Sequence, residues 1–276
     1  MSDQDLLARD GSRAAGPLQR GLRTFARGLM GALVLFALAE LVTNLGLVPT
    51  QYLPHATSIV ASMAGLLFDV SFLSQALATL SAWAAGLAAA TLIAVPLGIA
   101  LGSSETAYRA TSPLIEFMRP IPAAALIPIA ILVLGQGLAM KIALVAYATL
   151  WPILYNTVYG VHDVDPVAIQ TARAFGLSRL AVLRRAVLPS AAPFIFTGLR
   201  ISASLGLIVV VGAELLAAAT SGIGSYILNI STSGGDMDKV YAAAAVAGLL
   251  GVLINLAFAS IDRSAFKWRH LGATGD

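Results

Sequence analysis

Long apolar segments separated by short polar ones dominate the chain. Each segment is at least as long as the ~20 residues that an apolar helix needs to cross the hydrocarbon core of a bilayer. Only helices and closed barrels satisfy all backbone polar groups in lipid, so we predict an all-α membrane protein with six transmembrane helices. The predicted spans are residues 28–48, 73–102, 113–134, 139–161, 191–218 and 240–261.

A polar tail, residues 1–27, precedes the first span. It carries five arginines and shows no sustained apolar face. A signal peptide is the alternative interpretation of the first apolar run, because Ala37-Leu38-Ala39 has the small-x-small form of a cleavage site. We favour an uncleaved anchor, since the apolar run continues to Val48.

Prolines interrupt the third span at Pro113, Pro120, Pro122 and Pro128. Proline lacks a backbone N–H and clashes with the preceding turn, so this span cannot be a regular helix throughout. Irregular backbone at membrane depth is tolerated where protein or a water-filled cavity surrounds it. The Gly- and Ser-rich stretch 217–239 predicts a loop or a partly inserted hairpin between the last two spans.

The polar stretch 162–189 predicts a helix, a turn and a second helix. Asp165 is placed to cap the first helix, and Gly176 supplies the left-handed residue that ends it. Ser178 is placed to cap a second helix that stops before Pro189. Membrane-length apolar segments flank the unit on both sides and argue against a DNA-binding helix-turn-helix.

The spacing within this loop predicts one apolar face on each helix. The first face comprises Ala168, Ala172 and Phe175, and the second comprises Leu180, Leu183 and Val187. Such a unit is suited to binding a groove.

The distribution of Lys and Arg predicts the orientation of the chain in the membrane. With six spans and a cytoplasmic N-terminus, thirteen of the seventeen basic residues lie in cytoplasmic segments. The outer side holds only Lys141 and Lys239, while Arg119 and Arg200 lie within spans. This asymmetry follows the positive-inside rule and places both termini and the loop 162–189 in the cytoplasm.

Composition excludes several other classes of function. Hydrophobic residues make up 58% of the chain and charged residues 11%, and the net charge of +3 is too small to indicate nucleic-acid binding. The sequence has no cysteine, no catalytic triad pattern, no metal-ligand cluster and no GxxxxGK[ST] phosphate loop. We therefore predict a chain that is not an enzyme and binds no cofactor, with any ATP hydrolysis on another chain.

The loop resembles a known motif. Gln170-Thr171-Ala172, then Gly176, then Leu188-Pro189, is similar to the cytoplasmic Glu-Ala-Ala loop of ABC importer permeases, with Gln170 and Thr171 in place of the usual Glu and Ala. The resemblance implies a type I ABC importer permease fold, in which this coupling loop docks in a cleft of the ATPase subunit. The implied coupling residues are Ala168, Gln170, Thr171, Ala172, Phe175, Gly176, Leu188 and Pro189.

Other stretches resemble the nitrate, sulfonate and taurine branch of these permeases. They are Met118-Arg119-Pro120-Ile121-Pro122, Gly198-Leu199-Arg200, Ala213-Glu214 and Gly222-Ile223-Gly224. The resemblance implies a homodimer in the bacterial inner membrane, two ATPase subunits that bind ATP and Mg²⁺, and an extracytoplasmic solute-binding protein. It does not imply the substrate, because the branch also serves aromatic sulfonates, carboxylates and precursors of riboflavin and thiamine. We predict a small solute such as nitrate, a sulfonate, taurine or a related organic anion.

Charged residues within spans are candidates for function, because charge in a bilayer costs ~2.5–3.5 kcal/mol on insertion scales. Arg119 is expected to pair with Glu116 or to reach the inner surface, and Arg200 either pairs structurally or lines an anion pathway. Glu214 is expected in a helix-to-helix contact or an outer gate. The candidate pathway residues are Arg119, Arg200, Glu214, Gly222 and Gly224. The alternative function is an ion-coupled secondary transporter, for which Glu214 is the candidate coupling carboxylate and no inverted repeat is evident.

Overall fold

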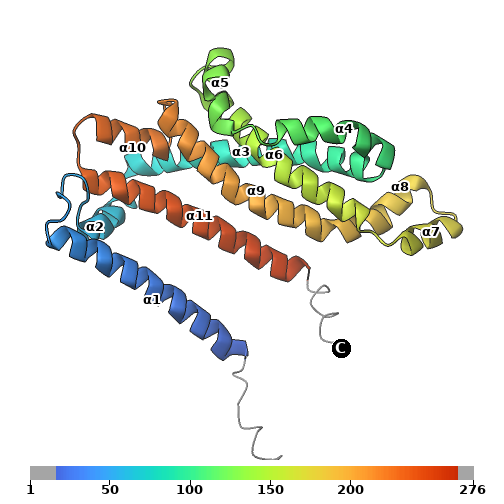
Figure 1. Cartoon of the computed structure of the whole chain (residues 1–276), viewed down its shortest axis with the longest axis horizontal. Helices are drawn as coiled ribbons and strands as arrows, with labels where there is room; N and C mark the ends of the chain where they lie inside the picture. The colour runs from blue at the N-terminus through green and yellow to red at the C-terminus, as the bar shows by residue number, and fades with distance from the viewer. Residues whose placement is uncertain (1–16, 267–276) are drawn as a thin grey trace, which may run out of the picture. The chain divides into compact units, whose positions relative to one another are not determined.

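The computed structural model describes residues 17–266, and the regular structure within that range is helical (Figure 1). The chain separates into two units, Met1–Ala61 and Ser62–Asp276. The first unit contains α1 (Pro17–Asn44) and the beginning of α2 (Ala56–Leu66). Residues 1–16 of the predicted tail lie outside the described range, whereas residues 17–27 belong to α1.

Within the first unit, Glu40 joins the end of α1 to the start of α2. Its carboxylate accepts hydrogen bonds from the backbone N–H and the hydroxyl of Thr57, each at 3.1 Å. The first of these bonds satisfies one of the free backbone N–H groups in the first turn of α2.

Three long helices form the centre of the second unit: α3 (Val70–Gly102), α6 (Leu138–His162) and α9 (Leu188–Leu216). Small residues let α3 and α6 approach closely. Three glycines of α3 face side chains of α6: Gly86 lies against Val145, Gly98 against Thr157 and Gly102 against Val161. A Cβ atom at Gly98 would lie 2.6 Å from the Cβ of Thr157, so the observed spacing requires glycine there.

The proline-rich third span is broken, as predicted. It comprises α4 (Glu105–Met118), a 3₁₀ turn η1 (Ala123–Leu126) and α5 (Ile127–Leu134), and the two halves are bent by 77°. The helix starts at Glu105, earlier than predicted, because Ser104 caps it by accepting from Ala107 N at 3.3 Å.

Two helices follow α9. The stretch 217–239 contains a short helix, α10 (Ile223–Thr232), and the chain then continues into α11 (Met237–Ala265). In Figure 1, α10 lies at one end of the second unit, and α7 and α8, described below, lie at the opposite end.

Four helices in the described part of the chain are long and apolar enough to cross a membrane: α3, α6, the helix from Arg179 to Leu216, and α11. The bent pair made of α4 and α5 would be a fifth span. In the first unit the apolar helix Leu33–Asn44 is shorter than a span, so the sixth span remains a prediction.

The close contact between α3 and α6 leads to a prediction about stability. Gly98→Leu should lower the free energy of unfolding by about 1–3 kcal/mol, because the larger side chain pushes the two helices apart. Gly65→Leu in α2 is the matched control, since nothing lies within 4 Å of a Cβ atom there. The thermal unfolding midpoint of each variant in detergent is the measurement, and equal midpoints would show that the helices are not held at this distance.

Candidate functional site

The helix-turn-helix predicted in residues 162–189 is present as α7 (Pro166–Ala174) and α8 (Arg179–Val182). The Asp165 carboxylate accepts from Val167 N at 2.8 Å, and the Ser178 hydroxyl accepts from Ala181 N at 3.3 Å, so both predicted caps are confirmed. Gly176 lies between the helices with φ +76°, a left-handed conformation that glycine adopts without steric strain.

The predicted end of the second helix is wrong. Instead of stopping before Pro189, α8 continues through a π turn η2 (Leu183–Val187) into α9. Pro189 has no N–H to donate to the carbonyl four residues earlier, and its ring clashes with that carbonyl in a regular helix. The wider π turn, in which Leu188 N donates to Leu183 O, lets the helix pass through this position.

The two predicted apolar faces are also wrong in part. Ala172, Leu183 and Val187 pack inward in one apolar cluster, as expected. Phe175 and Leu180 instead point outward, with exposed fractions of 81% and 54%. Phe175 leaves the helical period because α7 ends at Ala174, and Leu180 precedes the π turn, which changes the register of the side chains after it.

The exposed side of this helix-turn-helix carries three large apolar side chains together with two polar ones. We call it the loop surface, and it comprises Val167, Gln170, Thr171, Phe175 and Leu180, all exposed. Ala168 and Pro189 are also exposed, whereas Ala172 is partly buried. Large apolar side chains that are exposed close together in the chain, as Val167, Phe175 and Leu180 are, suit a protein-binding surface.

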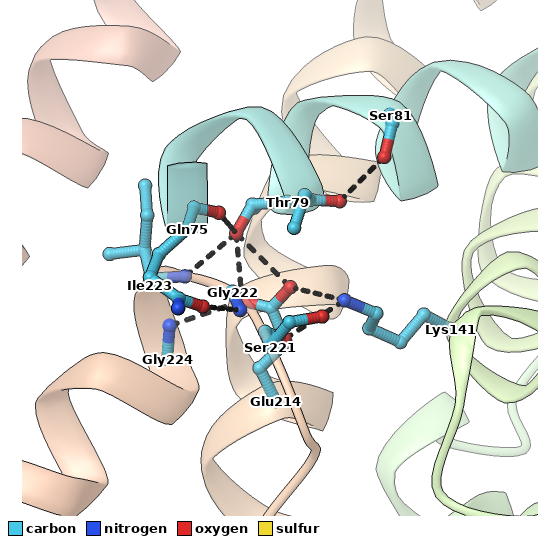
Figure 2. Close-up of polar contacts among 10 residues, drawn as sticks. Gln75, Thr79, Ser81, Lys141, Glu214, Ser221, Gly222, Ile223 and Gly224 are labelled. Atoms are coloured by element: carbon cyan, nitrogen blue, oxygen red, sulfur yellow. Dashed lines mark hydrogen bonds and ion pairs between the residues drawn. The ribbon is translucent and has the colours of Figure 1, made fainter. Parts of the chain in front are cut away.

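A buried polar cluster lies at the opposite end of the second unit (Figure 2). Its centre is an ion pair between Glu214 of α9 and Lys141 of α6, with 3.1 Å between Oε1 and Nζ and almost no exposure of either side chain. The Thr79 hydroxyl of α3 donates to Glu214 Oε2 at 2.9 Å, and the N–H of Gly224 donates to the same oxygen at 3.1 Å. We call this set, with Gln75 and the backbone of residues 221–224, the polar cluster.

The polar cluster also fixes the beginning of α10. Lys141 Nζ donates to Ser221 O at 3.0 Å. Gly222 N donates to Gln75 Oε1 at 2.7 Å, and Ile223 N donates to the Thr79 hydroxyl at 2.8 Å. The first N–H groups of α10 are therefore satisfied, and its positive end faces the Glu214 carboxylate.

Gly222 and Gly224 are required by this arrangement. Gly222 has φ +123°, and a Cβ atom there would collide with the Glu214 carboxylate. A Cβ atom at Gly224 would collide with the backbone oxygen of Val211. The Gly-Ile-Gly stretch thus lets the start of α10 lie directly against α9.

The helix-to-helix contact expected of Glu214 is therefore present, but its charged partner was missed. Lys141 was predicted on the outer side of the membrane from the charge distribution, but its burial beside Glu214 was not predicted. The order of the spans could have indicated this pair. Lys141 lies near the start of the fourth predicted span and Glu214 near the end of the fifth, and consecutive spans run in opposite directions, so both residues lie at the same depth in the membrane.

The other two candidate cations have uncharged partners. The Arg119 guanidinium lies 4.7 Å from the centre of the Tyr155 ring, a cation–π contact, and no ion pair to Glu116 forms among the described residues. Arg200 is partly buried, and its Nε donates to Asn255 Oδ1 of α11 at 3.0 Å. Asn255 also lines an apolar groove of about 580 Å³ between α9 and α11.

Comparisons with known proteins agree with this geometry. The family of binding-protein-dependent transport system inner membrane components matches residues 94–267. The taurine transport system permease protein TauC of Escherichia coli strain K12 is 34% identical over 235 residues, which cover 84% of this chain and 83% of TauC. The nitrate import permease protein NrtB of Leptolyngbya laminosa is 32% identical over 187 residues, which cover 68% of this chain and 66% of NrtB.

A solved structure of the inward-facing MetNI methionine ABC transporter contains a chain of the same fold. The TM-score is 0.62 at 19% identity, and the match covers 70% of this chain and 94% of that chain. The chain therefore belongs to the family of binding-protein-dependent transport system inner membrane components. It is a multi-pass permease subunit of an ABC importer, within the branch that includes taurine and nitrate permeases.

The polar cluster leads to a prediction about stability. Glu214→Gln should lower the free energy of unfolding by about 3–5 kcal/mol, because it leaves Lys141 charged and buried without a counter-charge. The double variant Lys141→Gln/Glu214→Gln should be less destabilised than the sum of the two single variants, since no charge is then buried. Unfolding of the purified variants in detergent is the measurement, and strictly additive effects would show that the two charges do not interact.

Proposed function

We propose that this chain imports a small anionic solute, such as nitrate, a sulfonate or taurine, delivered by an extracytoplasmic solute-binding protein. It would act as a homodimer in the bacterial inner membrane, with both termini and the loop surface on the cytoplasmic side. Two ATPase subunits, which carry ATP and Mg²⁺, would dock on the loop surface. The names of the taurine and nitrate relatives and the charge asymmetry of the sequence support this assignment.

One observation carries the coupling role of the loop: the helix that follows its turn is continuous with a membrane-spanning helix. Arg179–Leu216 is a single helix of 38 residues, roughly 57 Å long at 1.5 Å per residue. A rigid helix moves as one body, so a displacement of the loop surface would reach the far end of α9. Arg200 lies midway along this helix, and Glu214 lies near its far end.

The proposed pathway follows the face of α9 that lines the groove with α11. Arg200, hydrogen-bonded to Asn255 at the edge of this groove, would provide the positive charge for an anion. Arg119 would lie nearer the cytoplasmic side. At the outer end of the pathway, the role of Glu214, Gly222 and Gly224 would be structural: they would hold α10 against α9 and would not contact the solute.

Secondary ion-coupled transport, the alternative function, has less support. It would use an intramembrane carboxylate that is free to take up and release a proton or a sodium ion. Glu214 is engaged by Lys141, Thr79 and Gly224, so it is not free for that role.

The turn of the loop provides a test of ATPase docking. Gly176→Val should leave the chain inserted in the membrane but lower ATPase association and abolish uptake, because a β-branched residue is strained at φ +76° by roughly 1–2 kcal/mol and the direction of α7 changes. Gly137→Val, at a position with open space and an extended backbone, is the matched control. Pull-down of the ATPase and solute uptake at equal amounts of each variant are the measurements. Wild-type values for Gly176→Val would remove the coupling role from this loop.

Arg200 provides a separate test of the pathway. Arg200→Ala should reduce uptake at least tenfold while the complex remains assembled, since a charged contact to a small anion is worth about 1.5–3 kcal/mol. Arg200→Lys should restore only part of the activity if the guanidinium contacts the anion through two nitrogens. Asn255→Ala distinguishes a structural role of Arg200 from contact with the anion, because it removes the hydrogen-bond partner of Arg200 and keeps the positive charge. Unchanged uptake by Arg200→Ala would exclude this residue from the pathway.

A further inference from the structure

A cavity of about 630 Å³ lies between the inward side of the helix-turn-helix and the C-terminal ends of α3 and α6. Its volume is within the range of roughly 300–1,000 Å³ that is typical of small-molecule sites. Gly102 and Ser103 at the end of α3 and Val161 near the end of α6 form one side. Arg173 of α7 and Arg179 of α8 line the other side.

Within residues 17–266, the two arginines of this cavity form no ion pair with an acidic residue. The ion pairs among the described residues are His55–Glu40, Arg109–Glu105 and Lys141–Glu214, and none includes Arg173 or Arg179. Asp165, at the entrance to the loop, is already engaged as the cap of α7. Both arginines are exposed and line the same cavity. Guanidinium groups are complementary to a phosphate, because they can bind its oxygens through paired N–H groups.

Apart from Ser103 and the two arginines, the side chains that line the cavity are apolar, and they include Val182, Leu183 and Val187. Both α3 and α6 are long and apolar enough to span the membrane, so their ends lie at its surface. A ligand that enters from the membrane would present a charged headgroup to the arginines and hydrocarbon to these walls. Basic pockets between transmembrane helices bind anionic headgroups in this manner.

We propose that this cavity binds an anionic phospholipid, with Arg173 and Arg179 holding the phosphate and the apolar walls contacting the acyl chains. A bound lipid would fasten α7 to the ends of α3 and α6 and so stiffen the connection between the loop and the spans. The proposal rests on the membrane-spanning α3 and α6, and it does not depend on ATPase docking. None of the loop-surface residues lines the cavity, so both partners can bind at once.

Lipid binding to the full-length chain is the test. Native mass spectrometry would compare retention of phosphatidylglycerol and phosphatidylcholine by wild-type chain, by R173Q/R179Q and by R184Q/R185Q. The last pair is the matched control, because Arg184 and Arg185 are exposed, lie on the same segment and do not line the cavity. We expect R173Q/R179Q to bind phosphatidylglycerol about 25-fold more weakly, since each basic residue near an anionic lipid is worth about fivefold in affinity.

Three other outcomes would overturn the proposal. Equal losses in both double variants would assign the effect to the net charge of the loop rather than to the cavity. Undiminished binding in R173Q/R179Q would show that these arginines do not hold the lipid. Displacement of phosphatidylglycerol by inorganic phosphate at equal concentration would identify a free anion, rather than a lipid, as the occupant.

Discussion

A charged group buried among membrane-spanning helices needs a counter-charge within the protein, and this requirement determines how the helices pack at one end of the second unit. The Glu214 carboxylate is contacted by groups from three other helices. They are the Lys141 ammonium of α6, the Thr79 hydroxyl of α3 and the N–H of Gly224 in α10. Removing any one partner would leave a polar group unsatisfied in a low-dielectric environment. The ends of four helices are thereby held in one arrangement.

At the opposite end of the second unit, an exposed loop is connected rigidly to a membrane-spanning helix (Figure 1). Pro189 would normally break or kink a helix, but the π turn at Leu183–Val187 carries the helix past it. As a result α8 and α9 act as one element that runs from the loop surface to Glu214. One end of this element is anchored by buried charge, and the other presents exposed apolar side chains. This asymmetry suits a subunit that receives motion at one end and transmits it along its length.

Features that follow from single residues and their immediate neighbours were predicted from the sequence, whereas some helix ends, a change of helical register and one contact between helices were not. Several predicted features that follow from single residues and their neighbours are present in the structure. They are the helix caps at Asp165 and Ser178, the left-handed Gly176 and the broken third span. The outward position of Phe175 depends on where α7 ends, and the passage through Pro189 depends on a π turn, neither of which the helical period alone shows. The burial of Lys141 required knowledge that α6 and α9 pack side by side.

We propose that the loop surface is the contact through which an ATPase drives this permease. Phe175 is the most exposed of its apolar side chains, so a photoreactive phenylalanine analogue at position 175 places the probe directly on the claimed contact. The same analogue at Leu249, an exposed apolar position on α11, is the control. Irradiation of membranes that contain the whole transporter should yield a covalent adduct between position 175 and an ATPase subunit, and none from position 249. An adduct only to lipid or to other proteins at position 175, in membranes where the ATPase co-purifies with the chain, would contradict the account.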